Sequence, residues 1–175
     1  MTNAPGIDSQ GRVLVLGYGN PGRLDDGLGP AVAEAVDGWR LDGVTASADY
    51  QLTVEDGYAA AGHEVVIFAD AAAQGPAPYA WTRVRPEGAS SFTTHSVTPQ
   101  AVLGVASACF GAQPRAYVLA VRGYAFDAFG ERLSPGARRN LAAAVAFLAE
   151  VLRTGRFEDD PSPEVEAECA LRGPQ

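Results

Sequence analysis

The segment from Val13 to Ala33 most constrains the fold, because it joins a strand to a helix through a glycine-rich turn. Its four apolar residues 13–16 are typical of a short strand that is covered on both faces. Two adjacent carboxylates, Asp25 and Asp26, stand just before the helical pattern. Helix N-termini normally attract anions, since free N–H groups and the helix dipole point at the ligand. Two negative charges at this place instead favour a cation site or a carboxylate that takes part in chemistry.

Strand and helix patterns alternate along the rest of the chain. Apolar runs predict strands at about 12–17, 43–49, 65–69, 79–85 and 117–121. Helical periodicity predicts helices at about 28–38, 52–61, 99–110 and 135–153, the second capped by Thr53 and the last by Ser134. This order predicts an α/β three-layer sandwich, with a mostly parallel, twisted central sheet of about five strands flanked by helices. The segment 79–85 alternates polar and apolar residues, which is typical of an edge strand.

Composition excludes several classes of protein. The chain has 175 residues, enough for one domain with a substantial core. Its net charge of −8 argues against a nucleic-acid partner, and no apolar run is long enough to span a membrane. The two cysteines, Cys109 and Cys169, lack metal-site or disulfide spacing, and we expect Cys109 to be a small core side chain. These features, with no secretory leader pattern, predict a cytoplasmic protein.

Both ends of the chain differ from the predicted single domain at 11–155. Residues 1–10 are expected to be flexible. The segment 156–175 contains six acids and two arginines, a net charge of −4, together with three prolines and few large apolar residues. Such a segment cannot bury enough apolar surface to offset the entropy of ordering it, so we expect an acidic, disordered tail.

Three candidate site residues lie where strands end or a helix begins. Asp26 follows the first predicted strand, Asp70 the third, and His95 lies in a loop before a helix. Ligands bind at the carboxyl ends of parallel strands, so these side chains are expected to converge at one edge of the sheet. Two carboxylates and an imidazole suit a first-row divalent metal, with coordination positions left open. Each residue also has a simpler role: a helix cap for Asp25 or Asp26, a turn cap for Asp70, and a solvated loop position for His95.

The glycines also match the dinucleotide-binding pattern G-x-G-x-x-G, through Gly17, Gly19 and Gly22. Pro21 has no N–H to offer a pyrophosphate, and the helix starts several residues after the third glycine. The aspartate pair would repel the phosphates at the place where the helix should attract them. For these reasons, nucleotide binding by an α/β protein is kept only as an alternative hypothesis.

The same segment reads G-x-G-N-x-x-x-x-D-D-G-x-G from Gly17 to Gly29, which specifies seven positions in thirteen residues. This pattern resembles the hydrogenase maturation endopeptidases, which remove a short C-terminal extension from the large subunit of nickel-iron hydrogenases after nickel insertion. The resemblance continues through Asp70-Ala71 and the T-T-H-S segment around His95, and it covers about residues 12–153.

The resemblance implies a monomeric, aspartyl-type endopeptidase that acts on a hydrogenase large-subunit precursor. It carries the family's metal-contacting positions over to Asp26, Asp70 and His95, makes Asn20 a turn residue, and leaves Asp25 to orient the loop or tune charge. Many family members have Glu at the position of Asp26, and the shorter side chain changes its reach. Nickel bound in the precursor would be the recognition element, so no tightly retained ion is expected in the free enzyme. A non-catalytic nickel chaperone of a hydrogenase is the second alternative.

Overall fold

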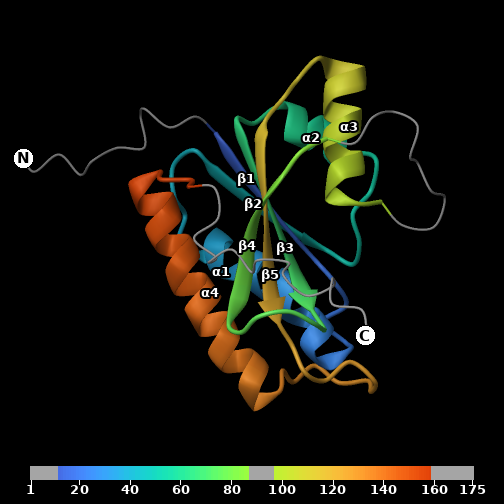
Figure 1. Ribbon diagram of the computed structural model, residues 1–175, viewed down its shortest axis with the longest axis vertical. Coiled ribbons are helices and arrows are strands. Elements are labelled where there is room, and N and C mark those ends of the chain that lie inside the picture. Colours follow the sequence, from blue (N-terminus) through green and yellow to red (C-terminus); the bar gives the residue numbers. More distant parts are fainter. Residues whose placement is uncertain (1–11, 87–96, 159–175) are drawn as a thin grey trace, which may run out of the picture.

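The computed structural model describes residues 12–86 and 97–158, which form a five-stranded sheet with helices on both faces (Figure 1). The strands are β1 (Val13–Tyr18), β2 (Val44–Asp49), β3 (Val65–Ala72), β4 (Tyr79–Val84) and β5 (Arg115–Arg122), in the order β2-β1-β3-β5-β4. The helices are α1 (Leu28–Gly38), α2 (Asp56–Ala61), α3 (Pro99–Phe110) and α4 (Pro135–Thr154), preceded by the 3-10 turn η1 (Leu24–Gly27). All neighbouring strands are parallel except β4, which runs antiparallel to β5 at one edge. The predicted three-layer α/β sandwich is confirmed.

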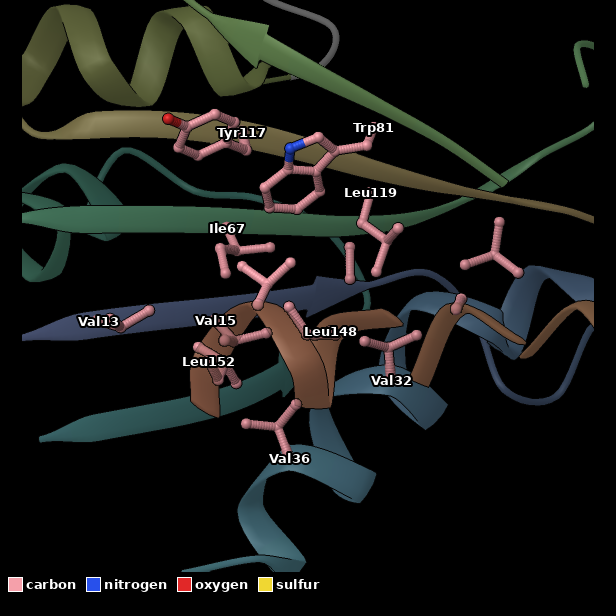
Figure 2. Close-up of a cluster of buried hydrophobic side chains, with 14 of the residues drawn as sticks. Val13, Val15, Val32, Val36, Ile67, Trp81, Tyr117, Leu119, Leu148 and Leu152 are labelled. Carbon is pink, nitrogen blue, oxygen red and sulfur yellow. The ribbon is translucent and has the colours of Figure 1, made fainter. Parts of the chain in front are cut away.

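Each face of the sheet has its own hydrophobic core, because successive strand residues point to opposite sides. On one face, alternate residues of the central strands pack against α1 and α4 around Val15, Ile67 and Leu148 (Figure 2). On the other face, their neighbours, such as Leu16 and Phe68, pack with α2 and α3. Burial on both sides explains why the central strands read as continuous apolar runs.

Helix boundaries follow local capping chemistry. The Ser134 hydroxyl accepts a hydrogen bond from the Ala137 N–H at the start of α4, and Gly155 ends that helix with φ of 62°. Both features agree with the predicted ends. The short helix α2 begins only at Asp56, later than predicted, and Thr53 does not cap it. Instead, the Thr53 N–H and hydroxyl both donate to the Asp56 carboxylate.

Two further expectations are corrected by the structure. The strand predicted to end at 69 continues to Ala72, so Asp70 lies inside β3 rather than just beyond it. Cys109, expected in the core, is exposed, because residues 108–110 in the last turn of α3 face solvent. No helix among the described residues is long and apolar enough to cross a membrane.

The chain remains packed on the sheet beyond α4. The Phe157 ring stacks on Tyr117 with centroids 5.9 Å apart, and the Tyr117 hydroxyl donates to the Phe157 carbonyl oxygen at 3.1 Å. One residue later, the Trp81 indole N–H donates to the Glu158 carbonyl oxygen. Phe157 and Glu158, near the start of the predicted tail, are therefore in contact with β5 and β4. The rest of that tail and the predicted flexible N-terminus lie outside the described residues.

Candidate active site at the carboxyl edge of the sheet

The glycines of the motif bring α1 directly onto the ends of the strands. A Cβ atom on Gly17 would collide with the Gly29 carbonyl oxygen, and one on Gly29 would collide with the Tyr18 carbonyl oxygen. Only glycines allow this approach of helix and strand backbones. The first turn of α1 is consequently buried, with Leu28 fully inaccessible to solvent. A buried helix N-terminus has no surface to offer a pyrophosphate, which argues against the nucleotide-binding alternative.

Asp25 points into the protein and joins two loops. Its carboxylate is fully buried and accepts hydrogen bonds from the Tyr124 N–H (2.7 Å), the Ala125 N–H (2.9 Å), the Ser134 N–H (2.7 Å) and the Ser134 hydroxyl (2.7 Å). Burial raises the pKa of Asp25, but these four hydrogen bonds outweigh it and hold the pKa below its ordinary value. Of the roles left open by the sequence, the structure assigns Asp25 that of orienting the loop. We call this arrangement the Asp25 clamp.

The backbone around the clamp ties the same two loops together. The Leu24 N–H donates to the Gly130 carbonyl oxygen at 2.7 Å, and the Gly130 N–H donates to the Gly22 carbonyl oxygen at 2.8 Å. The Asp25 N–H donates to the Ala125 carbonyl oxygen at 3.0 Å. The loop after β1 is thus held against the loop after β5 by both side-chain and backbone bonds, and the position of the next residue, Asp26, is set with it.

Asp26 is half-buried, and its carboxylate accepts a hydrogen bond from the Asn20 N–H at 2.8 Å. The Asn20 side-chain oxygen accepts in turn from the Gly22 N–H at 2.8 Å, which confirms the expected turn role of Asn20. Neither aspartate of the pair caps α1, whose N-cap residue is Gly27. The two neighbouring carboxylates therefore differ in environment. Asp25 accepts four hydrogen bonds from a distant loop, whereas among the described residues Asp26 accepts one from Asn20 in its own turn.

Asp70 lies near the carboxyl end of β3, the strand next to β1 in the sheet. One carboxylate oxygen accepts from the Ala71 N–H at 2.7 Å, and the Tyr18 hydroxyl at the end of β1 donates to the same carboxylate. Burial raises the pKa of Asp70 to about 6 against these two lowering hydrogen bonds, and the negative charge of Asp26 raises it further. The negative charge of Asp26 acts on Asp70, so the two predicted carboxylates lie near each other.

Tyr18 is the site residue that sequence reasoning missed. It occupies the variable position between Gly17 and Gly19, so the motif carries no signal for it. Parallel pairing of β1 with β3 aligns Gly17 with Ala69, and the next residue on each strand is Tyr18 and Asp70. Burial and the Asp70 carboxylate both raise the pKa of Tyr18, so its hydroxyl keeps its proton and donates it to Asp70 in a hydrogen bond. The register of the two strands, once known, would have revealed this pair.

The structure does not test the third predicted residue, because His95 lies outside the described residues. Within residues 12–86 and 97–158, no group of three or more histidine, cysteine, aspartate or glutamate side chains is arranged to hold a metal ion. Two carboxylates are therefore the part of the predicted ligand set that the described chain brings together. A carboxylate with a pKa near 6 beside a second carboxylate is able to exchange a proton near neutral pH or to bind a divalent cation.

No protein-family model and no curated protein sequence matches the chain. Solved structures do. The [NiFe] hydrogenase maturation protease HycI from Thermococcus kodakarensis is 20% identical, with a TM-score of 0.64 over 84% of this chain and 96% of that one. The hydrogenase 2 maturation peptidase from a Thaumarchaeota archaeon is 24% identical, with a TM-score of 0.60 over 81% and 97%. The hydrogenase maturating endopeptidase HybD from Escherichia coli is 22% identical, with a TM-score of 0.57 over 82% and 93%.

These likenesses establish the fold. The chain has the architecture of hydrogenase maturation proteases, and the match covers almost the whole length of each of those proteins. The resemblance carried by the glycine–aspartate motif is thus matched by an independent likeness of the entire sheet and its helices.

Proposed function

We propose that this protein is an endopeptidase that removes the C-terminal extension from a nickel-iron hydrogenase large-subunit precursor after nickel insertion. The observation that carries the proposal is the Asp26–Asp70 pair at the carboxyl edge of the sheet, in a fold shared with hydrogenase maturation proteases. Asp26 belongs to the glycine–aspartate motif, and Asp70 belongs to the Asp70-Ala71 segment through which the family resemblance continues. Fold, motif and site therefore support the same activity.

In this proposal, Asp26, Asp70 and His95 recognise the nickel that the precursor carries. Carboxylate and imidazole groups are suitable ligands for that ion, and three protein ligands leave positions for the precursor's own groups. Holding the nickel places the nearby peptide bond at the site, where one water molecule is consumed and a new carboxylate and a new amine are formed. The nickel arrives with the substrate, so the free enzyme retains no tightly bound ion.

The two described carboxylates have different supports in this role. Asp26 is oriented by the Asn20 N–H and by the adjacent Asp25 clamp. Asp70 is oriented by the Ala71 N–H and the Tyr18 hydroxyl. We further propose that the protein acts as a monomer in the cytoplasm, and the free thiol of Cys109 is compatible with a reducing compartment.

The decisive experiment incubates the protein with a nickel-loaded large-subunit precursor and measures the precursor's mass. We expect a shortened large subunit with wild type, and a processing rate lower by about 100-fold or more with Asp26→Asn or Asp70→Asn, since each removes a charge from the site. Asp42→Asn, the same change at an exposed turn before β2, is the matched control and should process normally.

Three outcomes would contradict the proposal or part of it. A precursor that binds but keeps its full mass would favour a nickel chaperone. Equal processing of nickel-loaded and nickel-free precursor would remove nickel as the recognition element. Normal processing by folded Asp26→Asn or Asp70→Asn would remove that residue from the site.

A further inference from the structure

The two edges of the sheet differ in how well they are protected against pairing with another strand. The edge strand β4 lies between Pro78 and Pro86 and carries Arg83, and its Trp81 donates a hydrogen bond to the Glu158 carbonyl oxygen in the segment after α4. Prolines, charges and covering segments are the usual means by which proteins prevent strand addition. At the opposite edge, β2 has the sequence V-T-A-S-A-D, which contains no proline, lysine or arginine. It pairs with β1 over six consecutive positions without a bulge.

The backbone of β2 offers hydrogen-bonding groups to a partner. The Gly43 carbonyl oxygen accepts from the Val13 N–H, and the Asp49 carbonyl oxygen accepts from the Gly19 N–H, so both of these residues face β1. Because backbone direction alternates along a strand, Ala46 and Ala48 direct their N–H and C=O groups away from β1. Among the strands that the structure describes, none lies on that outer side. The edge is therefore a ready template for an extended segment.

A groove runs beside this edge. It has a volume of about 330 Å³ and lies between α1, at Ala33, Glu34 and Asp37, and residues 46–48 of β2. The small side chains leave room for the side chains of an added strand. Asp37 forms an ion pair with Arg40 at 3.3 Å, whereas Glu34 has no cationic partner within the described residues. The groove therefore favours a segment that carries a lysine or arginine.

The edge leads directly to the candidate site. The last residue of β2, Asp49, accepts the Gly19 N–H through its carbonyl oxygen at 3.1 Å, and the next N–H, that of Asn20, donates to the Asp26 carboxylate at 2.8 Å. A strand laid along β2 thus emerges beside the loop that holds Asp26. Tyr50, which follows β2, is 67% exposed at this exit and offers an aromatic surface to the same segment.

We infer that the free edge of β2 binds the C-terminal segment of the precursor as an added strand and delivers the peptide bond to Asp26 and Asp70. This inference rests on the proposed function. Backbone hydrogen bonds to Ala46 and Ala48 supply affinity, and the groove beside Glu34 selects a basic side chain.

The test uses a proline that removes an outward N–H without touching the ladder to β1. In Ala48→Pro, we expect KM for the nickel-loaded precursor to rise about tenfold with kcat unchanged, since a backbone hydrogen bond to the substrate is lost and the ring obstructs the edge. Ala48→Ser keeps the N–H and is the matched control, with KM as in wild type.

A second pair of variants tests the charge of the groove. Glu34→Lys should raise KM about two- to fivefold, and salt should weaken this effect, whereas Glu64→Lys at the opposite end of the sheet should leave KM unchanged.

Hydrogen exchange gives a second readout that does not depend on the proline variant folding. The full-length Asp70→Asn protein is mixed with the nickel-loaded precursor, and we expect slower exchange of the amides of residues 44–49.

Unchanged exchange in a formed complex, or equal KM values for folded Ala48→Pro and Ala48→Ser, would overturn the inference while leaving the peptidase proposal intact. A change of mass by light scattering in Ala48→Pro, with KM unaffected, would assign the edge to a second copy of this chain. Wild type that neither binds nor shortens the precursor would overturn both proposals.

Discussion

Two neighbouring regions at the carboxyl edge of the sheet each bury one carboxylate, but the pKa is lowered in one region and raised in the other. In the Asp25 clamp, four hydrogen bonds of 2.7 to 2.9 Å lower the pKa despite complete burial. On β3, the hydrogen bonds that the described residues give to Asp70 come from the Ala71 N–H and the Tyr18 hydroxyl, and the pKa of Asp70 rises to about 6. Burial raises the pKa of both groups, but four hydrogen bonds outweigh it at Asp25, whereas at Asp70 burial and the charge of Asp26 outweigh two. A saturated carboxylate stabilises the fold, whereas an undersaturated one remains available to a proton or a cation.

Removing the charge of the clamp should have the largest effect on stability. In Asp25→Asn, the amide NH₂ group meets N–H donors, so we expect a loss of about 3 kcal/mol in the free energy of unfolding, measured by urea denaturation. In wild type, the folded-state pKa of Asp25 is lower than its ordinary value near 3.8. The stability that ionised Asp25 contributes is therefore fully present above about 3.8 and is lost as pH falls through the folded-state pKa. Asp127→Asn, an exposed change in the same loop region, is the control. A loss below about 1 kcal/mol would show that the clamp does not hold the two loops.

Asp70→Asn should change stability in the opposite direction. A folded-state pKa raised from 3.8 to about 6 means that stability is greatest below the ordinary pKa and is lost as pH rises through about 6. The full shift corresponds to at most about 3 kcal/mol, and partial solvent exposure of Asp70 reduces this, so we expect a gain of roughly 1–2 kcal/mol at pH 7.5. At pH 4 the gain should nearly vanish. Thermal unfolding at both pH values checks this prediction, and a variant less stable than wild type at pH 7.5 would contradict it.

The smallest effect tests the Tyr18 contact. In Tyr18→Phe, the carboxylate of Asp70 loses the hydrogen bond from the Tyr18 hydroxyl, so the pKa of Asp70 should rise further. An NMR titration of the carboxyl carbon measures this directly and needs no substrate. Tyr50→Phe, at a side chain that is 67% exposed, is the control and should leave the titration unchanged. An unmoved Asp70 titration in Tyr18→Phe would mean that the hydroxyl does not stabilise the ionised carboxylate.

Much of the fold and part of the site could be predicted from the sequence. The buried run 65–69 and the helix bounded by Ser134 and Gly155 depend on local pattern and capping, which act over a few residues. Asp26 and Asp70 could be selected because parallel strands end at one edge. The sequence predicts an end of β3 at residue 69, three residues too early. Residues 70–72 are less apolar but still pair with β5 through backbone hydrogen bonds, which a side-chain pattern does not report.

The sequence by itself determined the order of strands and helices, the glycine–aspartate motif and the two carboxylates, because each depends on local propensity or on a short pattern. Tertiary structure decided that Asp25 holds two loops together and that Asp70 is a carboxylate with a raised pKa. The donors that saturate Asp25 lie 99 to 109 residues away along the chain, and the Tyr18 hydroxyl reaches Asp70 only through the register of β1 and β3. Distant donors lower the pKa of Asp25, whereas burial between packed elements and the charge of Asp26 raise that of Asp70, and no local pattern specifies these surroundings.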